Sequence, residues 1–188
     1  MDIQVLRQNI IEGGRLLWDK DLVTACNGNI SLRVSDDTFL ITATGTCLGL
    51  LKVSDIVLIG KDGVVIEGGV PSTEKTLHLD IYINMPGVKA IVHTHNPYTN
   101  AYFLKYDVFK PATYEAEYVL GEVFSAKQSA VNVKDTHAVI ECLRRSSVAA
   151  LKRHGTVSVG AGLFECVARI QTLEEQIKTE AISRIFAM

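Results

Sequence analysis

The sequence predicts an α/β fold with three layers, in which a central mixed, mostly antiparallel sheet carries helices on both faces. Segments with apolar side chains at helical spacing alternate with short apolar runs that are typical of strands. The Asp-Gly pair at 62–63 joins two such runs, which indicates a hairpin and therefore antiparallel pairing. Because no repeat, low-complexity tract or linker interrupts this pattern, we expect a single domain spanning residues 1–188.

The first half of the chain begins with a helical pattern and then turns to short strands. The helix that follows them has Ser72 or Thr73 as its expected N-cap, because hydroxyl side chains accept hydrogen bonds from the first free N–H groups. The predicted elements are, in order, a helix at 3–17, a loop at 26–29, strands at 38–45, 55–60 and 64–69, and a helix that starts near 72.

The second half continues with the apolar stretch AIVHTHNP at 90–97, which reads as a buried strand. Asn96 and Pro97 are typical of a helix start, since proline is tolerated in the first turn. The remaining predicted elements are a helix at 134–145, strands at 147–151 and 156–160, and a long amphipathic helix at 163–186.

Composition excludes some classes of partner. The formal net charge is only −2 and 47% of residues are hydrophobic, so we expect neither nucleic acid nor an acidic membrane surface as a partner. The four cysteines show no CxxC spacing, and no signal peptide or long apolar run is visible, so a reducing cytoplasm is the expected location. A chain of this length can bury a core without metal, so stability alone does not require its histidines.

Two of the five histidines, His93 and His95, lie two residues apart in the predicted strand at 90–97. Side chains at i and i+2 of a strand project to the same side of a sheet. Two converging imidazoles suit a divalent metal, although a complete site needs further ligands.

The other ligands could come from several places. His154 lies where a strand ends, before a glycine that permits a tight turn. This position is equally compatible with a third metal ligand beside His93 and His95 and with a residue that has no role in the site. His78 and His137 fall in helices and are better interpreted as core or surface residues. Glu74 is the candidate carboxylate, although from pattern alone a charge that favours the helix dipole is the preferred interpretation.

Five motifs in register give this chain a resemblance over essentially its whole length. They are CNGNIS at 26–31, TATG at 42–45, PSTE at 71–74, HTH at 93–95 and HG at 154–155. In this order and at these intervals, the motifs resemble those of the class II aldolase/adducin family. The similarity is greatest to its small sugar-phosphate aldolases, typified by L-fuculose-1-phosphate aldolase.

The resemblance implies a metal site and a phosphate pocket. The implied metal is zinc, or another divalent ion such as Mn²⁺ or Co²⁺, and its ligands would be His93, His95, His154 and Glu74. The residues implied for substrate phosphate are Gly28, Asn29, Thr44, Gly45, Ser72 and Thr73. Hydroxyls, an amide and backbone N–H groups at a helix start can bind an anion without a basic residue.

The resemblance also implies a reaction. A ketose 1-phosphate would be cleaved to dihydroxyacetone phosphate and an aldehyde through a metal-stabilised enediolate. In the reverse direction Glu74 would be the base that removes a proton from dihydroxyacetone phosphate. Glu115 occupies the position of the tyrosine general acid of those aldolases, with Tyr114 one residue earlier. A glutamate there instead resembles the methylthioribulose-1-phosphate dehydratases of the family.

Several alternatives therefore remain at this stage. A dehydratase and a ribulose-phosphate 4-epimerase would use the same metal site. A non-enzymatic module like the adducin head would be expected to have lost its ligands, and a zinc hydrolase would not explain the phosphate motifs. The family resemblance further implies a homotetramer with sites between subunits.

Overall fold

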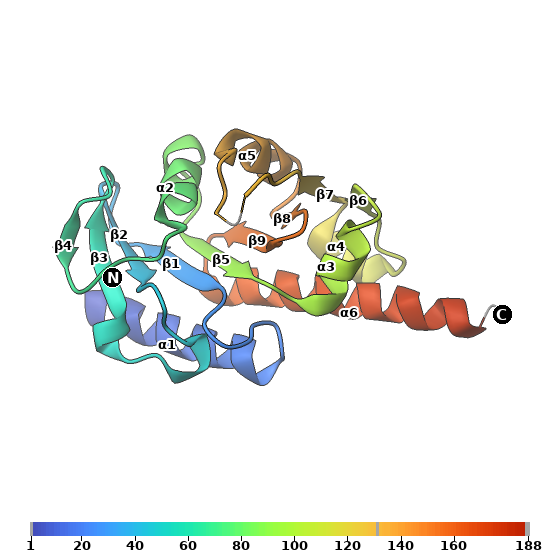
Figure 1. The fold of residues 1–188 in the computed structure, drawn as a ribbon, viewed down its shortest axis with the longest axis horizontal. Helices are drawn as coiled ribbons and strands as arrows, with labels where there is room; N and C mark the ends of the chain where they lie inside the picture. Colours follow the sequence, from blue (N-terminus) through green and yellow to red (C-terminus); the bar gives the residue numbers. More distant parts are fainter. Residues whose placement is uncertain (1, 131, 187–188) are drawn as a thin grey trace.

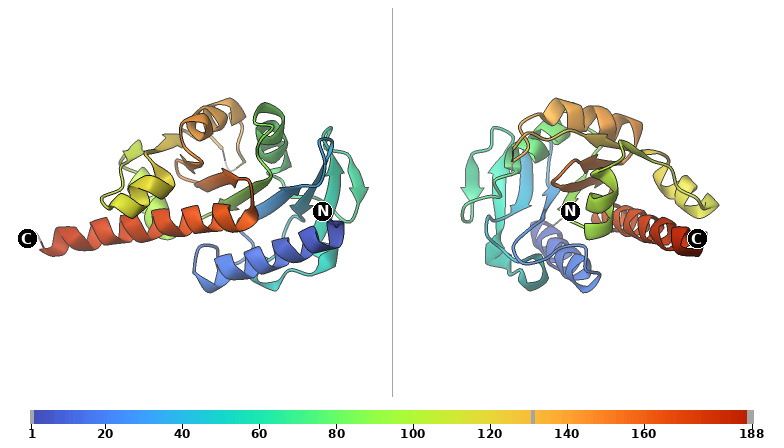
Figure 2. Two further views of the ribbon diagram at one scale, coloured as in Figure 1. Left: turned by 180° about the vertical axis from the view of Figure 1, so that it is seen from behind. Right: turned by 45° about the vertical axis from the view of Figure 1, so that its right-hand side comes forward.

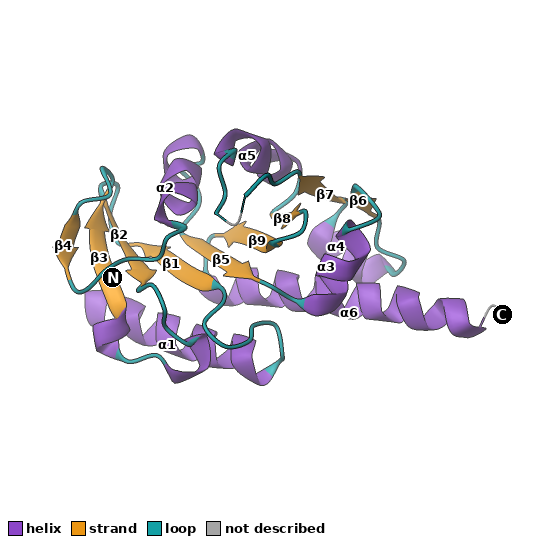
Figure 3. Ribbon diagram, viewed as in Figure 1, coloured by secondary structure: helices purple, strands orange, loops and turns teal. Residues whose placement is uncertain are grey.

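The computed structural model describes residues 2–130 and 132–186, and these form one nine-stranded sheet with helices on both faces (Figures 1 and 3). The helices are α1 (Ile3–Asp19), α2 (Lys75–Asn84), α3 (Pro97–Phe103), α4 (Tyr114–Leu120), α5 (Thr136–Arg145) and α6 (Leu163–Phe186). The strands, in their order across the sheet, are β4 (Val65–Glu67), β3 (Ile56–Gly60), β2 (Thr38–Thr42), β1 (Asn29–Arg33), β5 (Ala90–Thr94), β9 (Gly155–Gly160), β8 (Val148–Leu151), β7 (Val123–Ala126) and β6 (Val108–Phe109).

The sheet is mixed and mostly antiparallel, as the sequence predicted. Its neighbours pair antiparallel throughout, except that β7 runs parallel to β8. The predicted hairpin at the Asp-Gly turn is confirmed by the pairing of β3 with β4. Strand β1 was missed because the polar, glycine-containing segment before it reads as a loop, yet β1 pairs with both β2 and β5 in the middle of the sheet.

Two helical layers cover opposite faces of the sheet, and the views from two sides agree on this (Figures 1 and 2). Helices α2 and α5 pack on one face, where they share a hydrophobic cluster with alternate residues of the central strands. Helices α1 and α6 cover the other face, and α3 and α4 pack against α6 beside β7 and β8. Among the described helices, none is both long and apolar enough to cross a membrane.

Strand alternation decides which residues of β1 and β5 reach each layer. Ile30 and Val92 belong to the hydrophobic cluster under α1 and α6, whereas Ile91 belongs to the cluster under α2 and α5. Asn29 and His93 are paired neighbours on that second face. The sheet therefore presents polar side chains toward α2 at the end of β5.

The start of α2 differs from the prediction. The N-cap is Glu74 rather than Ser72 or Thr73, and the helix begins at Lys75. Ser72 still acts locally, because its Oγ accepts a hydrogen bond from the Glu74 N–H at 3.2 Å. The segment before the helix thus holds its hydroxyls and its carboxylate together in one turn.

Candidate functional site

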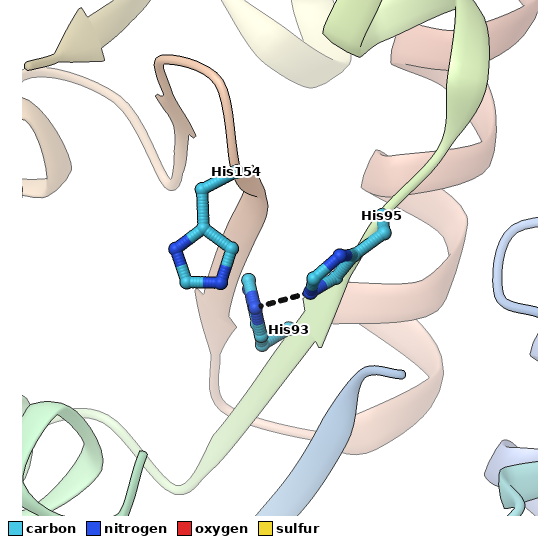
Figure 4. Close-up of side chains that lie close together, drawn as sticks. All are labelled: His93, His95 and His154. Atoms are coloured by element: carbon cyan, nitrogen blue, oxygen red, sulfur yellow. Dashed lines mark hydrogen bonds between the residues drawn. The ribbon is translucent and has the colours of Figure 1, made fainter. Parts of the chain in front are cut away.

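Three histidines from two parts of the chain converge at the end of β5 (Figure 4). His93 lies in β5, His95 directly follows that strand, and His154 lies in the turn between β8 and β9. Their potential ligand atoms all lie within 4.8 Å of one another, and they form the one such group found among the described residues. The prediction that the rings of His93 and His95 converge is confirmed, although His95 lies one residue beyond the strand, and His154 joins them.

Hydrogen bonds orient these rings for a cation. His93 donates from Nδ1 to the carbonyl oxygen of Thr156 at 3.0 Å, which leaves the lone pair of its Nε2 free. That Nε2 lies 2.9 Å from Nε2 of His95 (Figure 4). Nδ1 of His154 is buried and has no hydrogen-bond partner among the described residues. Ring nitrogens that face one another, together with an orphaned one, are the donor set that a divalent metal such as zinc, manganese or cobalt would satisfy.

The rings are also in the correct protonation state. Burial lowers the pKa of His93 well below its ordinary value, and the neighbouring His95 and His154 lower it further. Burial lowers the pKa of His95 to about 4 and also lowers the pKa of His154. All three are therefore neutral near pH 7, which is the form that coordinates metal.

Gly155 explains how the three rings come so close. A side chain at this position would overlap the carbonyl oxygen of Thr94 and would approach Cε1 of His93 to 2.9 Å. The expected reason for this glycine, a tight turn, is wrong, because Gly155 is the first residue of β9 and its φ is not positive. Its function is to let β9 approach the end of β5.

The histidines open into a cavity of about 230 Å³. All six residues that the resemblance assigns to phosphate line this cavity, namely Gly28, Asn29, Thr44, Gly45, Ser72 and Thr73. Gly28 and Gly45 have positive φ values of 78° and 72°, which other residues rarely adopt. Asn132 also lines the cavity and was not predicted, since nothing in its local sequence distinguishes it from a loop residue.

Glu74 lines the same cavity but stands apart from the imidazole group. Its side chain is buried at 6% exposure, and Oε2 accepts a hydrogen bond from the Val133 N–H at 3.4 Å. Burial raises the pKa of this carboxyl, while the Val133 N–H and Lys134 partly oppose that rise. Its assignment as ligand and base stays a prediction, and the simpler interpretation as a helix-start charge does not explain the burial.

The two residues predicted for proton transfer lie elsewhere. Tyr114 and Glu115 begin α4 and are exposed, with 92% exposure at Tyr114, and neither lines the cavity. The two other histidines match their simpler interpretation, since His137 is exposed and His78 is buried with hydrogen bonds at both ring nitrogens.

The fold and this geometry define an α/β protein with a candidate metal centre beside a pocket of hydroxyl, amide and glycine groups. The chain belongs to the class II aldolase and adducin family, since the family model described as "Class II Aldolase and Adducin N-terminal domain" matches residues 8–181.

Relatives and solved structures agree with this membership. An L-fuculose phosphate aldolase of Methanococcus vannielii is 35% identical over 173 residues, covering 91% of this chain and 93% of its own. A 3-oxo-tetronate 4-phosphate decarboxylase of Pectobacterium atrosepticum is 30% identical, covering 93% of this chain and 83% of its own. The crystal structure of L-fuculose-1-phosphate aldolase from Thermus thermophilus matches with a TM-score of 0.87 at 27% identity, over 97% of this chain and 95% of that one.

Proposed function

We propose that this protein is a metal-dependent aldolase that cleaves a ketose 1-phosphate similar to L-fuculose 1-phosphate, giving dihydroxyacetone phosphate and an aldehyde. The observation that carries the proposal is one cavity lined by three neutral imidazoles, a buried carboxylate and the hydroxyl, amide and glycine groups of the family's phosphate motifs. The names of relatives that are 31–35% identical support this activity.

His93, His95 and His154 would hold the metal, with Glu74 as a fourth ligand before substrate binds. When bound, a divalent ion supplies a Lewis acid that polarises the substrate carbonyl and offsets negative charge. The donor set suits zinc, and Mn²⁺ or Co²⁺ would also fit.

The phosphate would lie over the start of α2. Ser72 and Thr73 offer hydroxyls there, and the helix N-terminus adds free N–H groups and a favourable dipole. Thr44 and Gly45 line the same cavity. These groups bind an anion without a basic side chain, which agrees with the weak net charge of the chain.

Glu74 would move the proton at the carbon that becomes part of dihydroxyacetone phosphate. In cleavage its carboxyl group returns a proton to that carbon, and in the reverse direction its carboxylate removes the proton. Burial favours this role, because a carboxyl group with a raised pKa exchanges protons more readily near neutral pH.

Glu115, with Tyr114 as the alternative, would transfer the proton at the oxygen of the departing aldehyde. Since both residues are exposed and do not line the cavity of their own chain, we assign them to the site of a neighbouring subunit. This requires an oligomer with sites between subunits, for which we propose a homotetramer.

Other lyase reactions on the same scaffold are the second candidate. The decarboxylase relative at 30% identity and the glutamate at 115 favour decarboxylation of a 3-oxo acid phosphate or a dehydratase reaction. A 4-epimerase would use the same groups. A purely structural role is disfavoured, because the histidine cluster is intact.

One incubation series tests the proposal. Purified metal-loaded protein would be given a panel of ketose 1-phosphates, methylthioribulose 1-phosphate, ribulose 5-phosphate and 3-oxo-tetronate 4-phosphate. We expect dihydroxyacetone phosphate from a ketose 1-phosphate, and no turnover of the corresponding unphosphorylated ketoses, which are added to the panel as controls. If no ketose 1-phosphate is cleaved, release of carbon dioxide from 3-oxo-tetronate 4-phosphate, a dehydrated product or an epimer would assign the chain to the corresponding alternative.

A further inference from the structure

Four polar side chains form a continuous buried chain of hydrogen bonds between α2 and β1. Oδ1 of Asn29 lies 2.6 Å from Nε2 of His78, and Nδ1 of His78 lies 2.6 Å from Oγ of Ser31. Oγ of Ser31 in turn lies 2.9 Å from the hydroxyl of Tyr82. His78 and Tyr82 are one helical turn apart on the face of α2 that packs on the sheet, and all four residues are buried.

At the Tyr82 end of this hydrogen-bond network, the donor and the acceptor can be assigned. The Tyr82 hydroxyl has a single hydrogen-bond partner among the described residues, the Ser31 hydroxyl. Burial raises the pKa of Tyr82, so the phenol keeps its proton. A buried hydroxyl proton needs an acceptor, and therefore Tyr82 donates to Ser31.

The direction of each further hydrogen bond in the network follows from this assignment. Ser31 accepts from Tyr82 and so donates its own proton to Nδ1 of His78. Because Nδ1 accepts this hydrogen bond, the one proton of the ring must be on Nε2, which lies 2.6 Å from Oδ1 of Asn29. His78 consequently donates to Asn29, and the acceptor there must be the amide oxygen.

The orientation of the Asn29 amide follows. With Oδ1 bonded to His78, the Nδ2 group is left for the cavity that Asn29 lines, and it has no hydrogen-bond partner among the described residues. A phosphate group offers only acceptors at the cavity side, so an amide turned the other way would present its oxygen and repel it.

We propose that Tyr82, Ser31 and His78 are positioning residues that hold the Asn29 amide with its N–H groups toward the cavity, as a donor to the phosphate of the substrate. This proposal rests on the proposed function, in that the anion in this cavity is a phosphate. It assigns a role to His78, a residue that neither the metal centre nor the reaction uses, and it explains why an imidazole is buried there without a charged partner.

The test measures binding of inorganic phosphate to zinc-loaded protein by calorimetry. We expect Asn29→Ala and His78→Leu to weaken binding by about tenfold to a hundredfold, since a hydrogen bond to a charged group is lost or misaligned. His78→Gln, whose amide can still donate to Asn29, should recover most of the affinity. Tyr82→Phe should also weaken phosphate binding, because without the Tyr82 donor the Ser31 hydroxyl is no longer forced to donate to Nδ1 of His78.

Tyr102→Phe is the matched control. It removes another phenol hydrogen bond, from the Tyr102 hydroxyl to the carbonyl oxygen of Val108 in a part of the fold that does not line the cavity. Phosphate affinity should stay at the wild-type value in this variant. Nitrogen-15 NMR of the His78 ring should show a neutral ring protonated at Nε2 in the wild type and a mixture of tautomers in Tyr82→Phe.

The outcomes separate this proposal from the proposed function. If the wild type does not bind phosphate, the phosphate pocket of the proposed function fails, and the positioning role fails with it. If the wild type and Asn29→Ala bind phosphate equally, Asn29 is not a phosphate donor and the positioning role alone fails. If Asn29→Ala weakens binding but Tyr82→Phe does not exceed Tyr102→Phe, or His78→Gln is as weak as His78→Leu, the positioning role alone fails. A His78 ring protonated at Nδ1 would overturn it as well.

Discussion

Glu74 is a carboxylate with only 6% exposure that lies at the start of a helix and lines the cavity. A plain helix-start charge is worth about 0.3–1 kcal/mol and would leave catalysis nearly intact when replaced. We expect Glu74→Gln instead to lower turnover by about 10²–10⁴-fold, because a positioned base is lost while three imidazoles still hold metal.

The measurement is exchange of the hydrogen of dihydroxyacetone phosphate with deuterated water in the absence of aldehyde. Glu74→Gln should retain most of its metal and lose this exchange. Glu115→Gln is the control, since a distal acid is not needed without an aldehyde. Exchange at the wild-type rate in Glu74→Gln would make Glu74 structural and leave Glu115 as the candidate base.

The histidines also make stability depend on pH. Burial lowers the pKa of His95 to about 4, so the folded state disfavours protonation and the unfolded state takes up the proton first. Stability from this group is therefore full above pH 6.5 and is lost as the pH falls toward 4.

His95→Gln in metal-free protein should reduce the slope of unfolding free energy against pH in this window by up to about 1.4 kcal/mol per pH unit. Denaturant unfolding at several pH values measures it. His137→Gln, at an exposed histidine, is the matched control. Equal slopes in the two variants would contradict a neutral, half-buried His95.

At the scale of elements, helix α6 holds the start of α3 through one buried carboxylate. Glu174 accepts hydrogen bonds from the N–H groups of Tyr98 and Thr99 at 3.0 and 2.8 Å, and from the hydroxyl of Thr99 at 2.7 Å. It also accepts from Nδ2 of Asn96 at 3.1 Å, the residue directly after His95. The carboxylate thus replaces the missing helix cap of α3 and anchors the segment that carries a predicted metal ligand.

Glu174→Gln should lower the free energy of unfolding by about 1–3 kcal/mol, because an amide cannot accept all of these bonds. Metal affinity should fall as well, since the chain next to His95 loses its anchor. Glu175→Gln, the exposed neighbour on α6, is the matched control. Chemical denaturation and metal titration measure the two effects, and a stability loss equal to that of Glu175→Gln would contradict the anchoring role.

Elements whose pattern is strong along the chain were predictable. The two longest helices and the strands around the Asp-Gly turn follow from periodicity and turn chemistry. Strands β1, β6 and β7 and helix α4 were not predicted, because strands of two to five residues and a seven-residue helix have little periodic signal. Their identity depends on neighbours that are distant in sequence.

For the whole molecule, the exposure of α4 leads to a prediction about assembly. If Glu115 acts in a neighbouring subunit, a mixture of Glu74→Gln and Glu115→Gln protein, each inactive alone, should form some sites with both intact residues. After unfolding and joint refolding at equal amounts, activity should return to about a quarter of wild type. In a random assembly about half of the sites have an intact Glu74, and about half of those receive an intact Glu115 from the neighbouring subunit.

Turnover of the proposed substrate measures this recovery, and a mixture of Glu74→Gln with Tyr114→Phe tests the alternative residue. Glu74→Gln refolded alone is the control. A mixture that stays inactive, while each variant assembles as the wild type does, would place the acid within one chain and contradict the shared site.

The sequence by itself determined the α/β class, the pairing of His93 with His95 and the motifs that mark the family, because alternation and turn chemistry are local properties of a chain. Only the tertiary structure decided that His154 joins that pair, that Glu74 lies apart from the imidazoles, and that His78 contacts Asn29. These contacts link residues about 50 to 60 positions apart, and they depend on the order of strands β1, β5, β9 and β8 in the sheet and on how closely α2 packs against it. A residue pattern specifies which face a side chain occupies, whereas the distance between two such faces is set by packing of the whole molecule.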